Sequence, residues 1–274
     1  MKDEAHKIEE SPEAKKPDAR PAGEVATKLQ RTKRDFYPES AAGGYTHTDG
    51  TVEFFGRVNA LLDPTMVVLD YGAGRGRGAQ EDPVHWRRSL QTLKGKCGRL
   101  IGADIDPVVI ENPALDEALL IEPDGNLPLE DSSIDLIVSD ATFEHVADPA
   151  RVAAELGRVL KPGGWLCART PNRWGYIGLG TNLIPNRWHV ALLKYLQPHR
   201  KAEDVFPTVY KLNTRRDLKR YFPIDRWDHS VYGHFAEPAY FGTSKLMWGM
   251  VMLSYRATPA DLAPTWMIFL RKRK

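Results

Sequence analysis

The residues most suited to ligand chemistry form a short run near the end of the first quarter of the chain. An apolar stretch over 66–69 is followed by Asp70 and then by alternating glycines, Gly72, Gly74 and Gly76. Glycine lets the backbone turn sharply, and it lets a ligand approach the main chain with no Cβ in between. The following stretch, 79–93, can start a helix whose free N–H groups face the loop. Strand, glycine loop and helix in this order indicate a nucleotide-type binding site.

Acidic residues also follow two later apolar stretches. The stretch 99–103 ends at Asp104, and the stretch 134–139 ends at Asp140. In a nucleotide-binding unit, an acidic residue at the tip of the second strand accepts hydrogen bonds from ribose hydroxyls, so Asp104 is the better candidate there. Asp106 could instead cap a helix that begins directly after it. A structural role is the alternative for each carboxylate: Asp70 could cap the following turn, and Asp104 could be a surface loop residue.

Elements that alternate along the chain must position these residues. Short apolar runs predict strands over 66–69, 99–103, 118–121, 134–139, 165–170, 226–232 and 265–270. Helical spacing of apolar residues predicts helices over 51–62, 79–93, 149–160, 215–221 and 239–255. Strands and helices that alternate in this way predict an α/β, Rossmann-like, doubly wound sheet that is mostly parallel and has helices on both faces.

Composition narrows the classes of protein to which the chain could belong. Hydrophobic residues make up 42% of the sequence, which is enough for a sizeable core. The 38 basic residues are balanced by 36 acidic ones, and no basic stripe with interleaved aromatic residues is visible, so no nucleic-acid partner is expected. Cys97 and Cys167 are the only cysteines, which excludes a disulfide framework and a cysteine metal cluster. We expect no metal.

The first part of the chain differs from the rest in composition. Residues 1–33 are rich in Lys, Glu, Pro and Ala and poor in aromatic residues, so they are predicted to form a disordered, charged tail. A tether to a partner is the alternative function for this segment. The ordered domain is then expected to cover 34–274. The sequence shows neither an apolar leader nor a stretch of transmembrane length, which favours a cytoplasmic protein.

Five short motifs follow one another at close spacing and in a constant order. They are Asp70-Tyr71-Gly72-Ala73-Gly74-Arg75-Gly76, Gly102-Ala103-Asp104, Asp124-Gly125-Asn126-Leu127-Pro128, Ser133-Ile134-Asp135-Leu136-Ile137-Val138-Ser139 and Leu160-Lys161-Pro162-Gly163-Gly164. Together, over about 66–172, they resemble class I S-adenosylmethionine-dependent methyltransferases, in the group that includes small-molecule and ubiquinone-pathway enzymes (methyltransferase type 11 and 23 domains). The resemblance also implies that the last strand, 265–270, is antiparallel.

The resemblance assigns roles to the acidic and glycine residues. It implies that Asp70 and the loop glycines Gly72, Gly74 and Gly76 hold the methionine part of S-adenosylmethionine, that Asp104 binds the ribose, that Asp124 and the Gly125 backbone frame the adenine, and that Asp140 lies beside the methionine end and the acceptor mouth. A cationic sulfonium near several carboxylates is electrostatically sensible. The aromatic residue that the family places in its fourth strand is replaced by Ile134, which is also apolar.

The acceptor side is less well defined by the sequence. In the family, the region after the fifth strand often carries an insertion over the acceptor site, so about 173–213 is the candidate lid. Its aromatic and basic residues fit either a lid packed on the core, which we favour, or a face that meets a membrane or a lipid-linked acceptor. His145 is the nearest candidate for a general base, with a structural role as the alternative. His47, His189 and His199 are weaker candidates.

The sequence therefore predicts a methyltransferase that uses S-adenosylmethionine and acts on a small-molecule, glycan or lipid-linked acceptor, at oxygen. The first alternative is a protein of the same fold that binds the cofactor without turnover and serves as an interaction partner. The second is a nucleotide-dependent oxidoreductase, which the G-x-G-x-G spacing and the turn at 161–164 disfavour. The acceptor and the oligomeric state do not follow from the sequence, because variable loops build the acceptor pocket in this fold.

Overall fold

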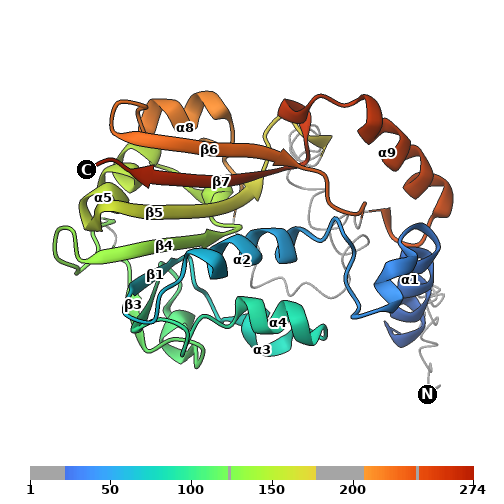
Figure 1. The fold of residues 1–274 in the computed structure, drawn as a ribbon, viewed down its shortest axis with the longest axis horizontal. Coiled ribbons are helices and arrows are strands. Elements are labelled where there is room, and N and C mark those ends of the chain that lie inside the picture. The colour runs from blue at the N-terminus through green and yellow to red at the C-terminus, as the bar shows by residue number, and fades with distance from the viewer. Residues whose placement is uncertain (1–21, 123–124, 177–206, 239–240) are drawn as a thin grey trace, which may run out of the picture.

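One seven-stranded sheet organises the chain in the computed structural model, which describes residues 22–122, 125–176, 207–238 and 241–274 (Figure 1). The strands are β1 (Val67–Tyr71), β2 (Arg99–Asp104), β3 (Glu117–Leu120), β4 (Ile134–Asp140), β5 (Leu160–Pro171), β6 (Trp227–His234) and β7 (Thr265–Lys272). Their order is β3-β2-β1-β4-β5-β7-β6, and β7 is antiparallel to both of its neighbours. The predicted fold class, with its antiparallel last strand, is confirmed.

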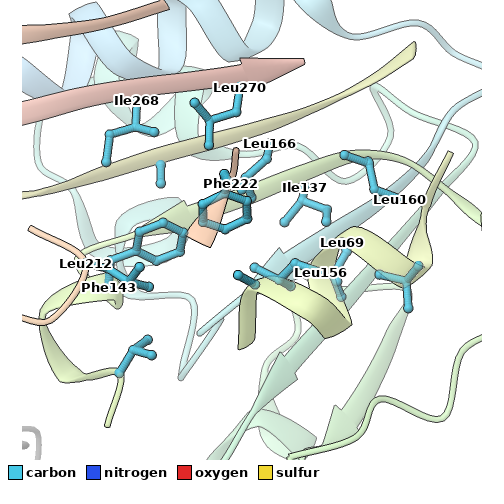
Figure 2. Packing of buried hydrophobic residues seen from close by; sticks show 14 of the residues in the cluster. Leu69, Ile137, Phe143, Leu156, Leu160, Leu166, Leu212, Phe222, Ile268 and Leu270 are labelled. Carbon is cyan, nitrogen blue, oxygen red and sulfur yellow. The ribbon is translucent and has the colours of Figure 1, made fainter. Parts of the chain in front are cut away.

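Helices cover both faces of this sheet. They are α1 (Ala22–Phe36), α2 (Gly50–Leu61), α3 (Arg77–Glu81), α4 (His85–Gln91), α5 (Pro149–Val159), α8 (Arg215–Tyr221) and α9 (Lys245–Ala257), with short 3-10 helices η1 (Pro38–Ala41), η2 (Pro107–Glu111), η3 (Phe143–His145) and η6 (Ala260–Leu262). Successive side chains of a strand point to opposite faces of the sheet, so neighbouring residues pack into different hydrophobic clusters. Leu69 joins the cluster that includes Leu156 of α5 (Figure 2), whereas Val68 joins the cluster that includes Phe55 of α2.

The carboxyl ends of the parallel strands bring the acidic residues to one edge of the sheet. In the register of the sheet, Asp70 lies beside Gly102 on β2 and Val138 on β4, while Asp104 and Asp140 end β2 and β4. The chain crosses from one side of β1 to the other between β2 and β4, and such a switch point opens a crevice outside the strand ends. The sheet therefore gathers residues that are up to 70 positions apart in the sequence.

The prediction of a disordered tail over 1–33 is wrong for residues 22–33, which belong to α1. Thr32 of this helix is 2% exposed, and its Oγ1 donates a hydrogen bond to the Thr243 carbonyl at 3.4 Å. The Phe36 ring lies 5.7 Å from that of Trp248 in α9, so the two helices pack together beyond the carboxyl edge of the sheet (Figure 1). The prediction relied on average composition, which does not reveal a helix that is polar on one side only. Residues 1–21 lie outside the described part of the chain.

Two further boundaries differ from the predicted ones for local reasons. The single helix predicted over 79–93 is split into α3 and α4, because Asp82 is extended before Pro83 and a residue before proline avoids the helical region. Helix α9 begins at 245 rather than 239, because the Ser244 hydroxyl accepts the Met247 N–H as its cap. Most of the predicted lid over 173–213 lies outside the described residues.

Candidate functional site

The glycine loop after β1 adopts a backbone that side chains would disturb. Gly72, Gly74 and Gly76 have φ values of 85°, 46° and 68°, in the left-handed region. A Cβ on Gly72 would lie 2.1 Å from Thr142 Oγ1, and one on Gly76 would lie 2.3 Å from Asn112 Oδ1. The Asn112 amide in turn donates hydrogen bonds to two loop carbonyls at 3.3 and 3.1 Å. Close packing on both sides therefore fixes this loop as a rigid cradle.

Asp104 is tied to the same loop. Its Oδ2 accepts the Gly74 N–H at 2.9 Å, and its Oδ1 accepts the Asp106 N–H at 2.9 Å. Each carboxylate oxygen keeps a further lone pair for a ligand. Asp106 caps η2 by accepting the Val108 N–H at 3.0 Å, so of the two acidic residues it is Asp106 that has the capping role.

A cavity of about 440 Å³ opens beside Asp104. Gly72, Asp104, Gly125 and His145 all line it, together with apolar side chains that include Val152. A cavity that combines polar groups with apolar surface suits a nucleoside. Gly125 has a φ of 74°, consistent with a tight turn at the rim. Asp124, predicted to frame the adenine with Gly125, lies outside the described residues.

Asp70 has fewer stabilising contacts than Asp104 and Asp140, the described carboxylates that end the neighbouring strands. No described residue donates a hydrogen bond to it, although it lines a smaller cavity of about 190 Å³ with Gly72, Gly76 and Asp140. Burial raises the pKa of Asp70 to about 7, and repulsion from Asp140 and Asp104 acts in the same direction. A carboxylate held in this way would gain from a nearby cation, because an opposite charge favours its ionised form.

Asp140, by contrast, has a strong partner in the next strand. Arg169 of β5 donates two hydrogen bonds to it, both at 2.7 Å, from Nε and Nη2. Its Nη1 also reaches Thr51 Oγ1 of α2 at 3.0 Å. Burial alone would lower the pKa of the Arg169 guanidinium, but its attraction to Asp140 raises the value overall. The pair is a charge-assisted bidentate clamp that fixes the end of β4.

A third cavity, of about 420 Å³, lies on the other side of this clamp, and we call it the acceptor cavity. Its lining combines apolar surface with polar and charged side chains, which are those of Asp49, Thr51, Arg87, Asp140, Arg169, Thr170, His234, Glu237 and Thr265. Arg87 bridges Asp49 at 3.0 Å and Asp82 at 2.8 Å. Glu237 pairs with Lys33 of α1 at 2.8 Å. The wall of this cavity is thus held by ion pairs from four distant parts of the chain.

His234 ends β6 at the rim of the acceptor cavity. Its Nε2 lies 3.0 Å from the Thr48 carbonyl oxygen. A carbonyl only accepts, so this nitrogen carries the hydrogen and Nδ1 is the basic one. Among the described residues, none donates a hydrogen bond to Nδ1. This geometry is what a general base requires: one nitrogen held by the protein and the other available to a ligand.

His145, the candidate base from the sequence, lies elsewhere. Its Nδ1 is 3.0 Å from the Pro207 carbonyl oxygen, and the ring lines the cavity beside Asp104 rather than the acceptor cavity. The neighbouring Glu144 is buried and accepts a hydrogen bond from Thr170 Oγ1 at 2.7 Å. A catalytic role for His145 stays a prediction. His47 is exposed and pairs with Glu39, and His189 and His199 lie outside the described residues.

The structure adds residues that the sequence reasoning missed. Arg169 and His234 both stand at the carboxyl ends of strands, which is the same signal that identified the aspartates. They are basic, however, whereas the motifs that predicted the site end their strands in acidic residues. Within the described residues, no group of three His, Cys, Asp or Glu side chains is placed to hold a metal ion, and no helix has the length and apolar character needed to cross a membrane.

Comparison with known proteins agrees with this arrangement. Residues 69–168 match the family model described as a methyltransferase domain. A probable S-adenosylmethionine-dependent methyltransferase of Mycobacterium tuberculosis is 47% identical over 113 residues, which cover 39% of this chain and 36% of that protein. A similarly named protein of Mycolicibacterium smegmatis is 33% identical over 109 residues, covering 39% of this chain and 38% of its own length. This chain thus spans little more than a third of the length of these curated relatives.

Solved structures share the fold at low sequence identity. A protein from the complex between a Haloferax volcanii methyltransferase activator and a methyltransferase has a TM-score of 0.51 and 17% identity, covering 92% of this chain and 97% of that one. A methyltransferase of Archaeoglobus fulgidus that depends on S-adenosylmethionine has a TM-score of 0.50 and 16% identity, covering 87% of this chain and 99% of that one.

The fold, the glycine cradle and the family match together define a class I S-adenosylmethionine-dependent methyltransferase domain. Residues 69–168 of this chain match that family, as the motifs predicted. The family's cofactor is S-adenosylmethionine. The matched region contains most of β1, all of β2 to β4 and most of β5, while α2, the end of β6 and the start of β7 also contribute residues to the acceptor cavity.

Proposed function

We propose that this protein transfers a methyl group from S-adenosylmethionine to a hydroxyl oxygen of a small polar molecule or glycan held in the acceptor cavity. One observation carries the proposal. Asp140 lines both the small cavity beside the glycine loop and the acceptor cavity, so a ligand in each would meet at the end of β4. The two ligands of a transfer reaction need such a meeting point, because positioning supplies much of the rate acceleration.

The residues present fit the cofactor. When bound, S-adenosylmethionine supplies an electrophilic methyl group on a cationic sulfonium. The cradle of Gly72 and Gly74 leaves the backbone open to close approach, and Asp104 keeps acceptor capacity for ribose hydroxyls. Asp70, which has no hydrogen-bond donor among the described residues, is suited to a cationic part of the ligand. Asp140 is already neutralised by Arg169, so its role is positional.

The lining of the acceptor cavity favours a polar acceptor over a lipid-linked one. Charged side chains from Asp49, Arg87, Glu237 and Arg169 surround the space, and burying an apolar chain against them would leave these groups desolvated. His234 supports an oxygen acceptor: its Nδ1 can take the proton that the hydroxyl loses as the new carbon–oxygen bond forms. Relatives do not decide the acceptor, since their names include an arsenite methyltransferase and a malonyl-[acyl-carrier protein] O-methyltransferase.

The first test is calorimetric titration of the whole chain with S-adenosylmethionine, beside an Asp104→Ala variant. We expect micromolar binding, weakened at least about tenfold in the variant, because a charged acceptor of two hydrogen bonds is lost. Absence of binding to the unaltered protein would exclude the proposal. Binding to both proteins with equal affinity would contradict the assignment of Asp104 to the ribose.

The second test separates an enzyme from a cofactor-binding protein without turnover. Polar hydroxylated compounds and oligosaccharides are screened for a mass gain of one methyl group. For any acceptor found, His234→Gln should lower kcat about 100-fold or more. His229→Gln is the matched control, because His229 lies on the same strand and is likewise held by a carbonyl, that of Phe222, at 2.7 Å. His145→Gln tests the earlier candidate in the same assay.

A further inference from the structure

We propose that a cavity separate from the methyl-transfer site binds the phosphate group of an organic phosphate. It has a volume of about 740 Å³ and lies beside α8. Arg173, Arg215, Arg216 and Arg220 line it together with Trp174 and Trp266, and we call it the arginine cavity. The proposal does not depend on the methyltransferase activity.

The arginine cavity lies at the same edge of the sheet as the acceptor cavity. Thr265 at the start of β7 lines the acceptor cavity, and the next residue, Trp266, lines the arginine cavity. Successive residues of a strand face opposite sides of a sheet, so the two cavities lie on opposite faces of β7. Arg173 lies two residues after the end of β5. The arginine cavity therefore belongs to the functional edge of the fold rather than to a remote surface.

The two carboxylates that line the arginine cavity already have local partners. Asp261 pairs with Arg215 Nε at 2.8 Å. Asp217 accepts a hydrogen bond from the Thr214 hydroxyl at 2.6 Å in the first turn of α8. Within the described part of the chain, neither of these carboxylates nor any other pairs with the remaining guanidinium groups, which are those of Arg173, Arg216 and Arg220. Among the described residues, the cavity thus holds three guanidinium groups that no carboxylate pairs with.

The arrangement of these arginines costs stability unless an anion neutralises them. Arg216 and Arg220 are four residues apart on α8, so they share one face of the helix and repel each other. Aromatic rings contact two of the other groups: the Arg215 guanidinium, which also pairs with Asp261, lies 4.8 Å from the centre of the Trp266 ring, and that of Arg173 lies 5.5 Å from the centre of the Trp174 ring. Stacking of this kind orients a guanidinium while leaving its N–H groups for a ligand.

A phosphate group matches this set of donors. Guanidinium groups bind phosphate oxygens through paired hydrogen bonds, and several converging arginines are the usual way to hold a dianion. Trp174 is 51% exposed and offers an apolar surface for the organic part of the ligand. The positive residues gather in one concavity rather than along a stripe, and the whole chain has a net charge of only +2. These features favour a small phosphate ester over a nucleic acid.

The test is a titration of the whole chain with inorganic diphosphate near physiological salt. We expect a Kd below about 1 mM for the unaltered protein and at least about tenfold weaker binding for Arg216→Gln/Arg220→Gln. Lys219→Gln is the matched control, because Lys219 is exposed on the same helix and does not line the cavity. It should change the affinity less than about twofold. An equal loss in the control, or no binding by the unaltered protein, would overturn the proposal.

Further titrations identify the source of the phosphate. Glycerol phosphate and vesicles of phosphatidic acid present the same chemical group, free in solution or at a lipid surface. Arginine-dependent binding of glycerol phosphate alone indicates that the ligand is a free metabolite. Arginine-dependent binding of the phosphatidic acid vesicles alone indicates that the ligand is a lipid headgroup. Tighter arginine-dependent binding of a single-stranded oligonucleotide than of diphosphate would refute a small-ligand site. S-adenosylmethionine affinity, measured on the same variants, should stay unchanged, which keeps this test distinct from that of the methyltransferase.

Discussion

The uncompensated carboxylate of Asp70 makes the stability of the cofactor-free protein depend on pH. Asp70→Asn keeps the shape of the side chain and removes its charge. In the folded protein the pKa of Asp70 is raised from 3.8 to about 7, first by burial and then by repulsion from Asp140 and Asp104. The folded state therefore binds the Asp70 proton more tightly than the unfolded state does.

The sign and size of the effect follow from this difference. As the pH rises from about 4 to about 7, the carboxyl ionises in the unfolded chain but stays protonated in the folded one, so the free energy of unfolding falls. Each pKa unit corresponds to about 1.4 kcal/mol, which sets an upper limit of about 4 kcal/mol over this interval. Above about pH 7 the contribution levels off because both states are ionised. Partial exposure of the side chain reduces the figure.

The assay is urea unfolding at several pH values between about 4 and 8 without cofactor. Asp70→Asn should be more stable than the unaltered protein at pH 8 by about 2–4 kcal/mol, with the difference vanishing near pH 4. Asp225→Asn, at an exposed carboxylate, is the control and should not change the pH dependence. The same Asp70→Asn variant should bind S-adenosylmethionine more weakly, since it lacks the charge that the ligand neutralises. A stability difference that stays constant from pH 5 to pH 8 would refute the reasoning.

Three other substitutions test the cradle, the clamp and the helix pair. Gly72→Ala should weaken S-adenosylmethionine binding at least about tenfold in calorimetry. The left-handed backbone at this position disfavours a side chain by about 1–2 kcal/mol, and the Cβ of the new alanine would meet Thr142. The control is Gly56→Ala, which lies in open space on α2 and should bind the cofactor normally. Arg169→Lys cannot form the paired bonds to Asp140 and should lower the free energy of unfolding by about 1–3 kcal/mol, so an unchanged urea midpoint would contradict the clamp. Phe36→Ala should cost about 1–3 kcal/mol and speed proteolysis within α1, and equal cleavage rates would argue against its packing on α9.

The sequence predicted the parts of the site that depend on local pattern. Asp70, Asp104 and Asp140 each follow an apolar strand, and parallel strands in one sheet must end at one edge, so their proximity followed from the pattern alone. The glycine loop was recognisable for the same reason. His234 was not, because its role depends on the Thr48 carbonyl, which lies 186 residues away in the chain. No local rule joins two such positions.

Helix α1 shows a second limit of sequence reasoning. Its composition resembles that of a disordered segment, and isolated helices of this length are marginal in water. It is ordered because Thr32, Lys33 and Phe36 find partners that lie more than 200 residues later in the chain. The acceptor cavity is similarly built from segments far apart, and its chemistry becomes visible only when Asp49, Arg169 and Glu237 are brought to one wall.

The ion pair between Lys33 and Glu237 has a practical meaning for work on this protein. Glu237 lines the acceptor cavity, and Lys33 of α1 forms an ion pair with this glutamate. On composition alone, α1 would be taken for a disordered segment and removed from an expressed protein. A shortened protein that begins after residue 36 would keep the whole glycine cradle and Asp104, and so would still titrate with the cofactor. It would nevertheless expose an unpaired glutamate in the cavity and uncover Trp248. Acceptor screens made with such a trimmed protein would report on a different cavity from the native one.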